Sequence, residues 1–358
     1  MNAQEIPKLR VAKVDGEKVR QLLFHFSLVD FEQAIVRDER FIWFPLTREP
    51  NSSEWNQIRD LDSDSIVEML NSNTAKGDRH PKNLMEALSG SVDPALLERL
   101  NHSFDIIGDI AIIEVPEQLA SLKKSIGEAI TKVHKGVKTV LCKSGAVDGR
   151  FRVRSYELVV GEKKTETIHV EHGCRFKLDV TKVYFSPRLA TEHIRVASQA
   201  SSKELVIDMF SAVGPFSILI AKLKKAQVYS FDINPSAINY LKTNCILNKV
   251  ENLVHPILGD AKKIIQTSMK STADRIIMNL PSQSLKFIDA ACLALKPEGG
   301  IIHSYQFQAD PDPLKKAEEA LRVNIELNSR RIQKIREARL VKSVAPHEWH
   351  VAVDAEVT

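Results

Sequence analysis

The second half of this 358-residue chain alternates short apolar segments with segments of helical spacing, and that alternation restricts the possible folds most strongly. Strands that alternate with helices of about 10–15 residues form βαβ units, in which the strands are parallel. From about residue 182 we therefore predict an α/β domain with a mostly parallel sheet. The predicted strands are 204–209, 227–232, 253–258, 275–279, 299–305, 323–335 and 349–355, with helices at 214–223 and 235–248.

Each of the first four predicted strands ends in a polar residue, namely Asp208, Asp232, Asp260 and Asn279. Ligands of such sheets bind outside the carboxyl ends of the strands. A single acid there often caps the next helix, but four polar ends in register indicate a ligand site. Gly214 allows a close backbone approach. Because it is a lone glycine, the segment does not match G-x-G-x-x-G, which disfavours a nicotinamide dehydrogenase.

The first region, to about residue 60, has strand-like segments at 9–14 and 34–45 and a helical pattern at 16–26. The polar stretch 51–76 is a linker candidate, with a helical middle at 65–70. In the second region, Gly108 and Asp109 break 104–116 into two short strands. A helix at 116–134 and strands at 137–142, 152–160 and 166–169 follow. We predict an N-terminal domain at 1–65, an α+β domain at 66–180 and the α/β domain at 181–358.

Charge and cysteine content narrow the function classes. The net charge is +4, but basic residues cluster at 121–154 and 330–342, where they neutralise phosphates or form solvated surfaces. Four scattered cysteines indicate neither a disulfide framework nor a metal site, and they fit a reducing cytoplasm. No apolar run approaches the roughly 20 residues of a membrane span, and residues 1–13 lack the apolar core of a signal peptide.

Several segments together resemble a known family, the archaeal and eukaryotic tRNA (guanine-N1)-methyltransferases that act on position 37. They are KVYFSPRLATEHIR, DMFSAVGPFS, FDINPSAI, GDA and NLP, with FDIIGDIAIIEVP, FRVRSYEL and VKSVAPHEWH elsewhere, so the resemblance covers nearly the whole chain. It implies a class I Rossmann-like methyltransferase domain with a mostly parallel seven-stranded sheet, preceded by smaller α+β domains. It also implies S-adenosyl-L-methionine as cofactor, tRNA as partner and a monomeric cytoplasmic enzyme.

The resemblance also implies a set of cofactor contacts. They are His193, Asp232, Ile233, Asp260, Ala261 and Asn279, with Tyr184, Asp208 and Gly214 lining the same pocket. An acid placed like Asp232 accepts hydrogen bonds from ribose hydroxyls. Ala212 stands where many relatives carry glycine, and its methyl group should be tolerated unless this residue takes a positive φ.

Methylation of guanine N1 removes a proton and moves negative charge onto O6, so a carboxylate near N1 and a cation near O6 suit the reaction. In the family resemblance, Glu192 matches the general base and Arg152 matches the cation. The alternatives are a first-turn acid that complements the helix dipole, for Glu192, and a phosphate contact, for Arg152. In the segment Asn279-Leu280-Pro281-Ser282, Ser282 replaces a stacking aromatic residue, which argues against methylation of an exocyclic amine.

A base inside an RNA loop must be extruded before its Watson–Crick edge can be read. The basic stretch 121–154 suits the anticodon stem, and by resemblance the first region would contact the outer corner of the tRNA. Three other functions stay open. They are aminocarboxypropyl transfer to a tricyclic guanosine derivative, an additional methylation of such a base, and non-catalytic tRNA binding.

Overall fold

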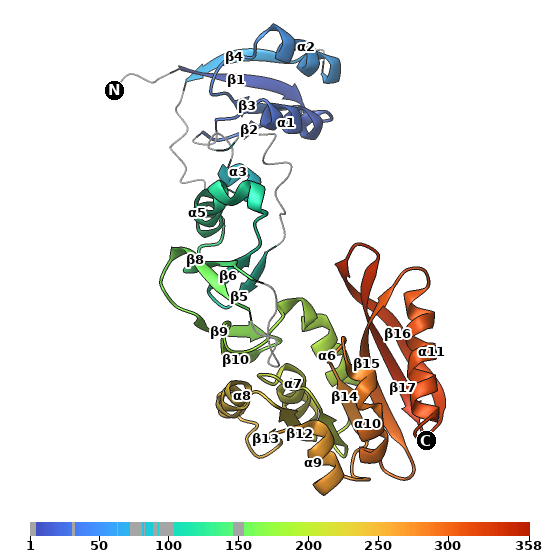
Figure 1. The fold of residues 1–358 in the computed structure, drawn as a ribbon. Coiled ribbons are helices and arrows are strands. Elements are labelled where there is room, and N and C mark those ends of the chain that lie inside the picture. The colour runs from blue at the N-terminus through green and yellow to red at the C-terminus, as the bar shows by residue number, and fades with distance from the viewer. Residues whose placement is uncertain are drawn as a thin grey trace. The chain divides into compact units, whose positions relative to one another are not determined.

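The computed structural model describes residues 5–30, 33–62, 64–71, 81, 83–88, 92, 104–145 and 154–358. The chain divides into two compact units (Figure 1). The first comprises Met1–Phe104, Ala111–Lys143 and Glu157–Lys163, and the second comprises Asp105–Ile110, Ser144–Tyr156 and Lys164–Thr358. The predicted domain boundaries at residues 65 and 180 stay predictions. In the described part of the chain, no helix has the length and apolar character that crossing a membrane requires.

The N-terminal part of the first unit is a four-stranded sheet of order β2-β3-β1-β4 with two helices. Its elements are β1 (Glu5–Ala12), α1 (Gly16–His25), β2 (Val36–Arg37), β3 (Phe41–Pro45), α2 (Ser52–Leu61) and β4 (Ile66–Asn71). Leu9, Val19, Leu23, Phe44 and Ile58 are buried between sheet and helices. The predicted helix 16–26 and the strands within 9–14 and 34–45 are confirmed.

The predictions for 51–76 were wrong in two places. Residues 52–61 form α2 rather than a linker, because Asn51 and Glu54 make a reciprocal capping box that satisfies the first N–H groups of the helix. Residues 65–70 are not helical, because β4 pairs antiparallel with β1, from Glu5 opposite Asn71 to Arg10 opposite Ile66. That partner strand, about 60 residues away in the chain, outweighs the local pattern.

The remainder of the first unit contains a short mixed module. Its elements are α3 (Leu84–Leu88), β6 (Ile110–Ile113), the 3₁₀ turn η1 (Glu117–Leu122), α5 (Lys123–Val133), β7 (Thr139–Lys143) and β8 (Tyr156–Gly161). The strands neighbour one another in the order β6-β7-β8. Gly108, at a φ of 58°, forms the break between β5 (Asp105–Ile107) and β6, as the sequence predicts. The first residues of the predicted strand 152–160 lie outside the described residues.

The second unit contains a hairpin and a seven-stranded sheet of order β13-β12-β11-β14-β15-β17-β16. The hairpin is β9 (Glu166–Glu171) with β10 (Cys174–Asp179), of which β10 was not predicted. The sheet consists of β11 (Leu205–Asp208), β12 (Gln227–Asp232), β13 (Val254–Leu258), β14 (Arg275–Met278), β15 (Gly300–Ala309), β16 (Ile332–Ala345) and β17 (Glu348–Val357). Five strands are parallel, and β17 runs antiparallel to β15 and β16. The predicted Rossmann-like fold is confirmed.

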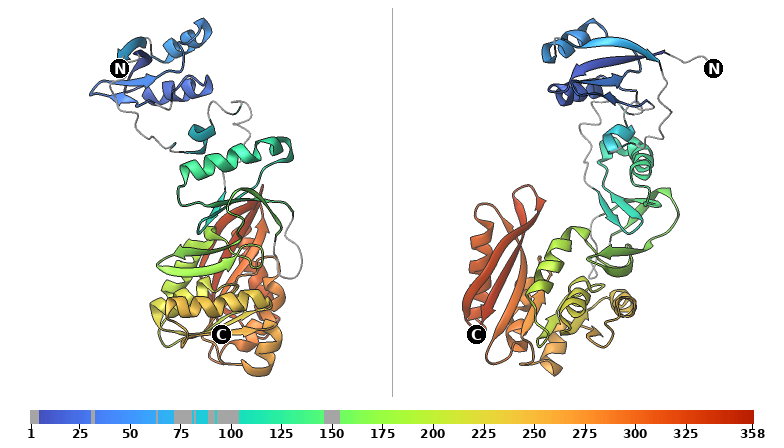
Figure 2. Two further views of the ribbon diagram at one scale, coloured as in Figure 1. Left: turned by 90° about the vertical axis from the view of Figure 1, so that its left-hand side faces the viewer. Right: turned by 180° about the vertical axis from the view of Figure 1, so that it is seen from behind.

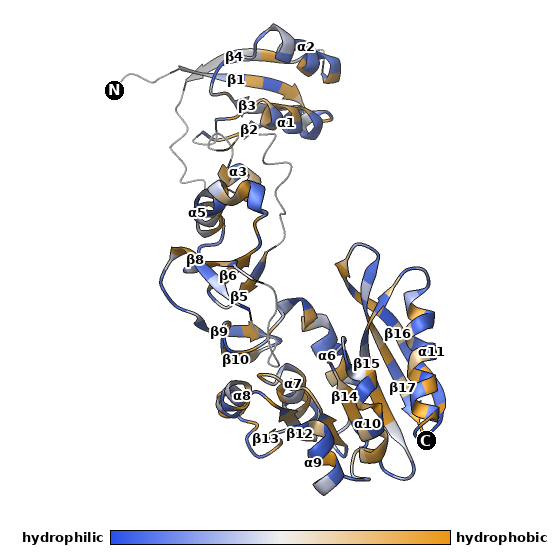
Figure 3. Ribbon diagram, viewed as in Figure 1, coloured by the Kyte–Doolittle hydropathy of each residue, from blue (hydrophilic) through white to orange (hydrophobic). Residues whose placement is uncertain are grey.

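Helices cover both faces of this sheet (Figure 2). On one face lie α6 (Ala190–Gln199), α7 (Pro215–Lys224) and α8 (Pro235–Asn248), and on the other α9 (Ala261–Ser268), α10 (Ile288–Ala294) and α11 (Pro313–Glu326). Figure 3 shows both hydrophilic and hydrophobic residues along α11, as expected for a helix with one buried face. Strand β14 is buried throughout, as expected for a central parallel strand.

The predicted strand 323–335 was wrong in its first part, because α11 continues to Glu326 and β16 begins only at Ile332. Ala317, Leu321 and Ile325 follow one another at helical spacing and are fully buried. Val323, which suggested a strand, is 54% exposed on the other side of the helix.

Candidate active site

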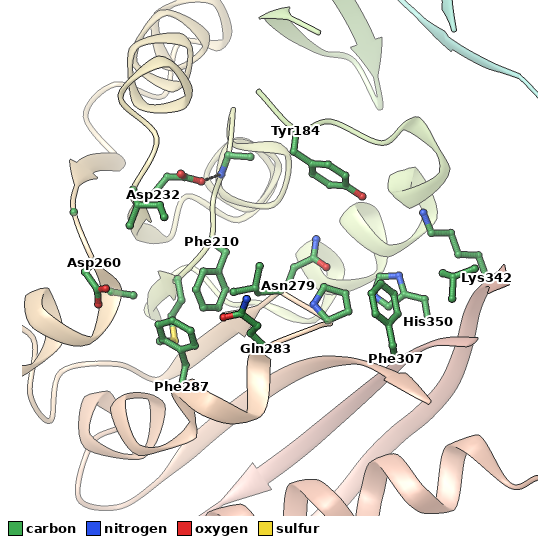
Figure 4. A pocket seen from close by; sticks show the side chains of 18 residues that line it. Tyr184, Phe210, Asp232, Asp260, Asn279, Gln283, Phe287, Phe307, Lys342 and His350 are labelled. Carbon is green, nitrogen blue, oxygen red and sulfur yellow. Dashed lines mark hydrogen bonds between the residues drawn. The ribbon is translucent and has the colours of Figure 1, made fainter. Parts of the chain in front are cut away.

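A cavity of about 430 Å³ opens at the carboxyl ends of β11, β12, β13 and β14. The segments that follow these strands supply one wall, and residues of β15, β16 and β17 supply another. Figure 4 shows Asp232 and Asp260 on one side, Asn279 in the middle, and Lys342 and His350 on the other side. This is where a doubly wound sheet binds its ligands.

Asp232, at the end of β12, accepts hydrogen bonds from the backbone of two turns. Its Oδ2 accepts the N–H of Ala212 at 2.9 Å, and its Oδ1 accepts the N–H of Asn234 at 2.8 Å. Burial raises the pKa of Asp232, although these hydrogen bonds oppose the shift. Ala212 has a φ of 47°, a positive value at which the methyl group of alanine causes backbone strain.

The walls near Asp260 are largely apolar. Asp260 caps α9 and accepts the N–H of Lys262 at 3.0 Å. Phe210 and Phe287 meet edge to face, with ring centroids 4.9 Å apart, and the Lys262 ammonium lies 5.5 Å from the Phe287 centroid. Ile233, Ala261, Asn279 and Tyr184, all predicted site residues, also line the cavity. Flat apolar walls with a few oriented polar groups suit an aromatic ligand with hydroxyl groups.

Three other predicted residues lie outside the cavity lining. Asp208 is fully buried and accepts a hydrogen bond from Ser217 Oγ at 2.7 Å, and burial raises its pKa to about 7. Gly214 has a φ of 92°, and a Cβ there would lie 2.2 Å from Leu241 Cδ1, so a glycine is required where α7 begins. His193 is buried, with its Nδ1 2.6 Å from Glu171 Oε1.

Glu192 lies in the first turn of α6 and is also buried outside the cavity lining. Its Oε2 accepts hydrogen bonds from Arg195 Nη2 and from the Tyr305 hydroxyl, each at 2.9 Å. Arg339 Nη1 lies 3.4 Å from Oε1. The Tyr305 ring packs 5.4 Å from the ring of His350, which lines the cavity. Tyr305 therefore connects Glu192, the general-base candidate, to His350 in the cavity wall.

Arg195 extends this arrangement into a buried charged cluster. It also binds Asp354, which accepts a hydrogen bond from His303 Nδ1 at 2.7 Å. His303 Nε2 lies 2.7 Å from Arg275 Nη1. Although burial acts in the opposite direction, His303 and Arg195 hold the pKa of Asp354 well below its usual range. The second sequence candidate for the reaction centre, Arg152, lies outside the described residues.

Sequence reasoning assigned no role to several residues that line the cavity. They are Met209, Phe210, Gly259, Leu280, Pro281, Gln283, Phe287, Phe307, Val344 and His350. The segment VKSVAPHEWH, which carries part of the family resemblance, contains Val344 and His350, and also Lys342, the last residue of the basic cluster 330–342. Its place beside the strand ends depends on the antiparallel pairing of β17 with β15 and β16, which no local pattern reveals.

Comparisons with known proteins agree with this geometry. Residues 167–333 match the model of the TRM5/TYW2 methyltransferase domain, and residues 84–165 match that of the TYW2 N-terminal domain. The tRNA (guanine(37)-N(1))-methyltransferase Trm5b of Pyrococcus abyssi is 40% identical over 357 residues, covering 98% of each chain. Its crystal structure covers 99% of each chain with a TM-score of 0.72.

Two further relatives bear on the substrate. A complex of aTrm5 with tRNALeu is 33% identical, with a TM-score of 0.69, and covers 98% of this chain and 99% of that one. A tRNA(Phe) (4-demethylwyosine(37)-C(7)) aminocarboxypropyltransferase of Methanocaldococcus jannaschii is 36% identical and covers 70% of this chain and 96% of its own. With this fold, this cavity and relatives that match along its whole length, the chain belongs to the TRM5/TYW2 methyltransferase family.

Proposed function

We propose that the protein transfers the methyl group of S-adenosyl-L-methionine to N1 of guanine 37 of tRNA. The observation that supports this most directly is the meeting of Asp232, Asp260 and Asn279 at one cavity. The chain around that cavity also matches a guanine-37 methyltransferase over 98% of its length.

The residues present fit the cofactor. We assign Asp232 to the ribose hydroxyls, because its carboxylate is fixed by two backbone N–H groups and each oxygen has a further acceptor position. Phe210, Ile233 and Phe287 give the apolar surface that an adenine ring needs, and Asp260 lies beside them for its amino group. When bound, the cofactor supplies an electrophilic methyl group on a sulfonium. The remaining task of the chain is to align the base and remove its proton.

We assign proton removal to Glu192 and stabilisation of the charge on O6 to Arg152. Support for Glu192 comes from Tyr305, which donates to its carboxylate and packs against the cavity residue His350. Support for Arg152 comes from its motif, FRVRSYEL, within the family resemblance. We also assign His193 and Tyr184 to the cofactor site, with Asp208 and Gly214 shaping the turn behind it.

We propose that the enzyme acts as a monomer in the cytoplasm and binds the anticodon loop and the outer corner of tRNA. Basic residues in 121–154 suit the stem backbone, and we assign residues 1–65 to the outer corner, 66–180 to RNA and active-site contacts, and 181–358 to catalysis. The four cysteines are free and buried, which fits a reducing compartment. Outer-corner contacts predict tighter binding of full tRNA than of an anticodon stem-loop, measurable by titration of both.

Aminocarboxypropyl transfer is the second candidate, because one such enzyme is 36% identical. Its likeness covers 70% of this chain, whereas the guanine methyltransferase covers 98%, so methyl transfer is favoured. The deciding experiment gives the enzyme unmodified tRNA and cofactor labelled either in the methyl group or in the carboxyl group. Nucleoside analysis should find the methyl label in 1-methylguanosine. Carboxyl label in the RNA would support the second candidate, and absence of both labels would leave a non-catalytic tRNA-binding protein.

A further inference from the structure

The two carboxylate oxygens of Glu192 are held in different ways. Oε2 accepts from Arg195 Nη2 and the Tyr305 hydroxyl, both at 2.9 Å, and from Arg195 Nε at 3.1 Å. The contacts of Oε1 are longer, 3.3 Å to Arg195 Nε and 3.4 Å to Arg339 Nη1. Tyr305 is fully buried and the Arg195 side chain is 12% exposed, whereas that of Arg339 is 36% exposed. Oε2 is thus the more firmly held oxygen. Oε1 is held by longer contacts, one of them to the more exposed Arg339.

The groups that anchor Oε2 are themselves fixed. Arg195 also binds Asp354 and donates to Glu337 Oε2 at 3.1 Å, so its guanidinium has partners on β16 and β17. Asp354 in turn accepts from His303 Nδ1 at 2.7 Å and Gln199 Nε2 at 3.0 Å. A guanidinium with partners on several edges keeps one orientation, because its donors lie in a rigid plane.

Tyr305 provides the second anchor from β15. Burial raises the pKa of Tyr305 well above its usual value, so the phenol retains its proton and acts as a donor to Glu192. Its ring lies between Phe216, at a centroid distance of 5.9 Å, and His350, at 5.4 Å. Because His350 lines the cavity, the Tyr305 ring sets the position of the carboxylate relative to the cavity wall.

We propose that Arg195 and Tyr305 are positioning residues, which hold Glu192 through Oε2 so that Oε1 receives the proton of guanine N1. This rests on the proposed function, in which Glu192 is the general base. The N1–H bond breaks and its electron pair forms the bond to the methyl carbon, whose bond to the cofactor sulfur would break with its electron pair left on the sulfur, while the proton forms an O–H bond at Oε1. Arg339 is then the contact that must turn away, because it is the more exposed of the two groups that contact this oxygen.

The test is a double-variant cycle of Tyr305→Phe and Glu192→Gln in the full-length enzyme. Single-turnover methyl transfer to tRNA, cofactor affinity and thermal unfolding are measured for all four proteins. Tyr305→Phe should slow transfer about tenfold, the effect of one hydrogen bond to a charged group, and should add little to Glu192→Gln. Tyr240→Phe is the matched control, since Tyr240 donates to Glu166 at 2.7 Å in the same unit.

The unfolding measurements give a readout that does not depend on activity. The destabilisation caused by Tyr305→Phe should shrink when Glu192→Gln is also present, because the hydroxyl then loses its charged acceptor. Arg195→Lys, which keeps the charge but not the fork, should slow transfer and leave cofactor affinity within about twofold.

The outcomes separate the two proposals. A wild-type enzyme that forms no 1-methylguanosine contradicts the proposed function. If Glu192→Gln transfers methyl groups at the wild-type rate, Glu192 is not the base and the positioning proposal fails with it. Equal slowing by Tyr305→Phe with glutamate or glutamine at position 192 would overturn the positioning proposal and leave the proposed function standing.

Discussion

Two groups of acidic residues in the second unit, only a few side chains apart, are built on different principles. Asp232 and Asp260 lie at strand ends, line an open cavity and each accept a backbone N–H group from the turn that follows. Glu192 and Asp354 are 2% and 1% exposed and share the guanidinium of Arg195. The first group directs acceptor positions toward a ligand, and the second binds its charges to one another.

This difference determines whether a substitution in each group changes ligand binding or folding stability. An acid at a cavity remains hydrated when one contact is removed, so its substitution should affect ligand binding more than folding. A buried ion pair is only modestly stabilising as a whole, but removal of one partner leaves a buried charge and costs about 3–5 kcal/mol. Substitutions should therefore separate the two groups by what they change, and the following predictions are ordered by expected size.

Glu192→Gln should have the largest effect on the reaction, because it retains the shape and one acceptor oxygen but cannot take the N1 proton. Single-turnover methyl transfer should slow by about 10²–10⁴-fold, the usual value of a positioned general base. Binding of cofactor and tRNA, measured by calorimetry, should change little. Weaker binding of cofactor or tRNA with a single-turnover rate near that of the wild type would instead indicate a structural Glu192.

The same contrast explains how far sequence analysis could go. Asp232, Asp260 and Asn279 could be found because each ends a strand whose pattern is local, and parallel strands bring such ends to one edge. Two partners of Glu192 could not be found, since Tyr305 and Arg339 lie far along the chain and meet it only through the sheet. Among the segments predicted wrongly, 65–70 depends on a partner strand distant in sequence. By contrast, 52–61 and the start of 323–335 carry local helix signals, a capping box and helical spacing, that the prediction did not use.

A buried acid without a guanidinium should behave in the opposite way to Asp354. Burial raises the pKa of Asp208 to about 7, above its unfolded value of about 3.9. Its contribution to stability is therefore complete below about pH 4 and is lost as the pH rises through about 7. Asp208→Asn removes this loss, so the stability of the variant relative to the wild type should increase between pH 4 and 7, by on the order of 4 kcal/mol.

Chemical denaturation of both proteins across that pH range measures the effect. The control is Asp274→Asn, at an acid that is not fully buried, bound to Lys296 at 2.6 Å and outside the cavity lining. A difference between wild type and Asp208→Asn that stays constant from pH 4 to 7 would mean that Asp208 is ionised in the folded protein throughout this range.

Asp232→Ala should weaken cofactor binding by about 1–3 kcal/mol, since the ribose hydroxyls lose their acceptor and two backbone N–H groups lose theirs. Isothermal titration with the cofactor measures this directly. Asp232→Asn is the matched variant, because it retains one acceptor oxygen and should lose less. If Asp232→Ala bound the cofactor as the wild type does, the ribose assignment would be wrong, and the cavity would belong to another ligand.

The smallest effect is expected at Ala212, the residue whose N–H binds Asp232. A φ of 47° costs a residue with a Cβ about 1–2 kcal/mol, and Ala212→Gly removes that cost while adding about 0.5–1 kcal/mol of backbone entropy to the unfolded chain. The net result should be a gain in unfolding free energy of up to about 1 kcal/mol, measured by denaturant titration. Ala261→Gly is the control, because Ala261 also lines the cavity but begins α9 with a negative φ, so glycine brings the entropy loss and removes a buried methyl group without relieving strain. The two variants should therefore change stability in opposite directions. Equal destabilisation by both would mean that the positive φ at position 212 costs the folded chain nothing, and that alanine serves there as well as the glycine of the relatives.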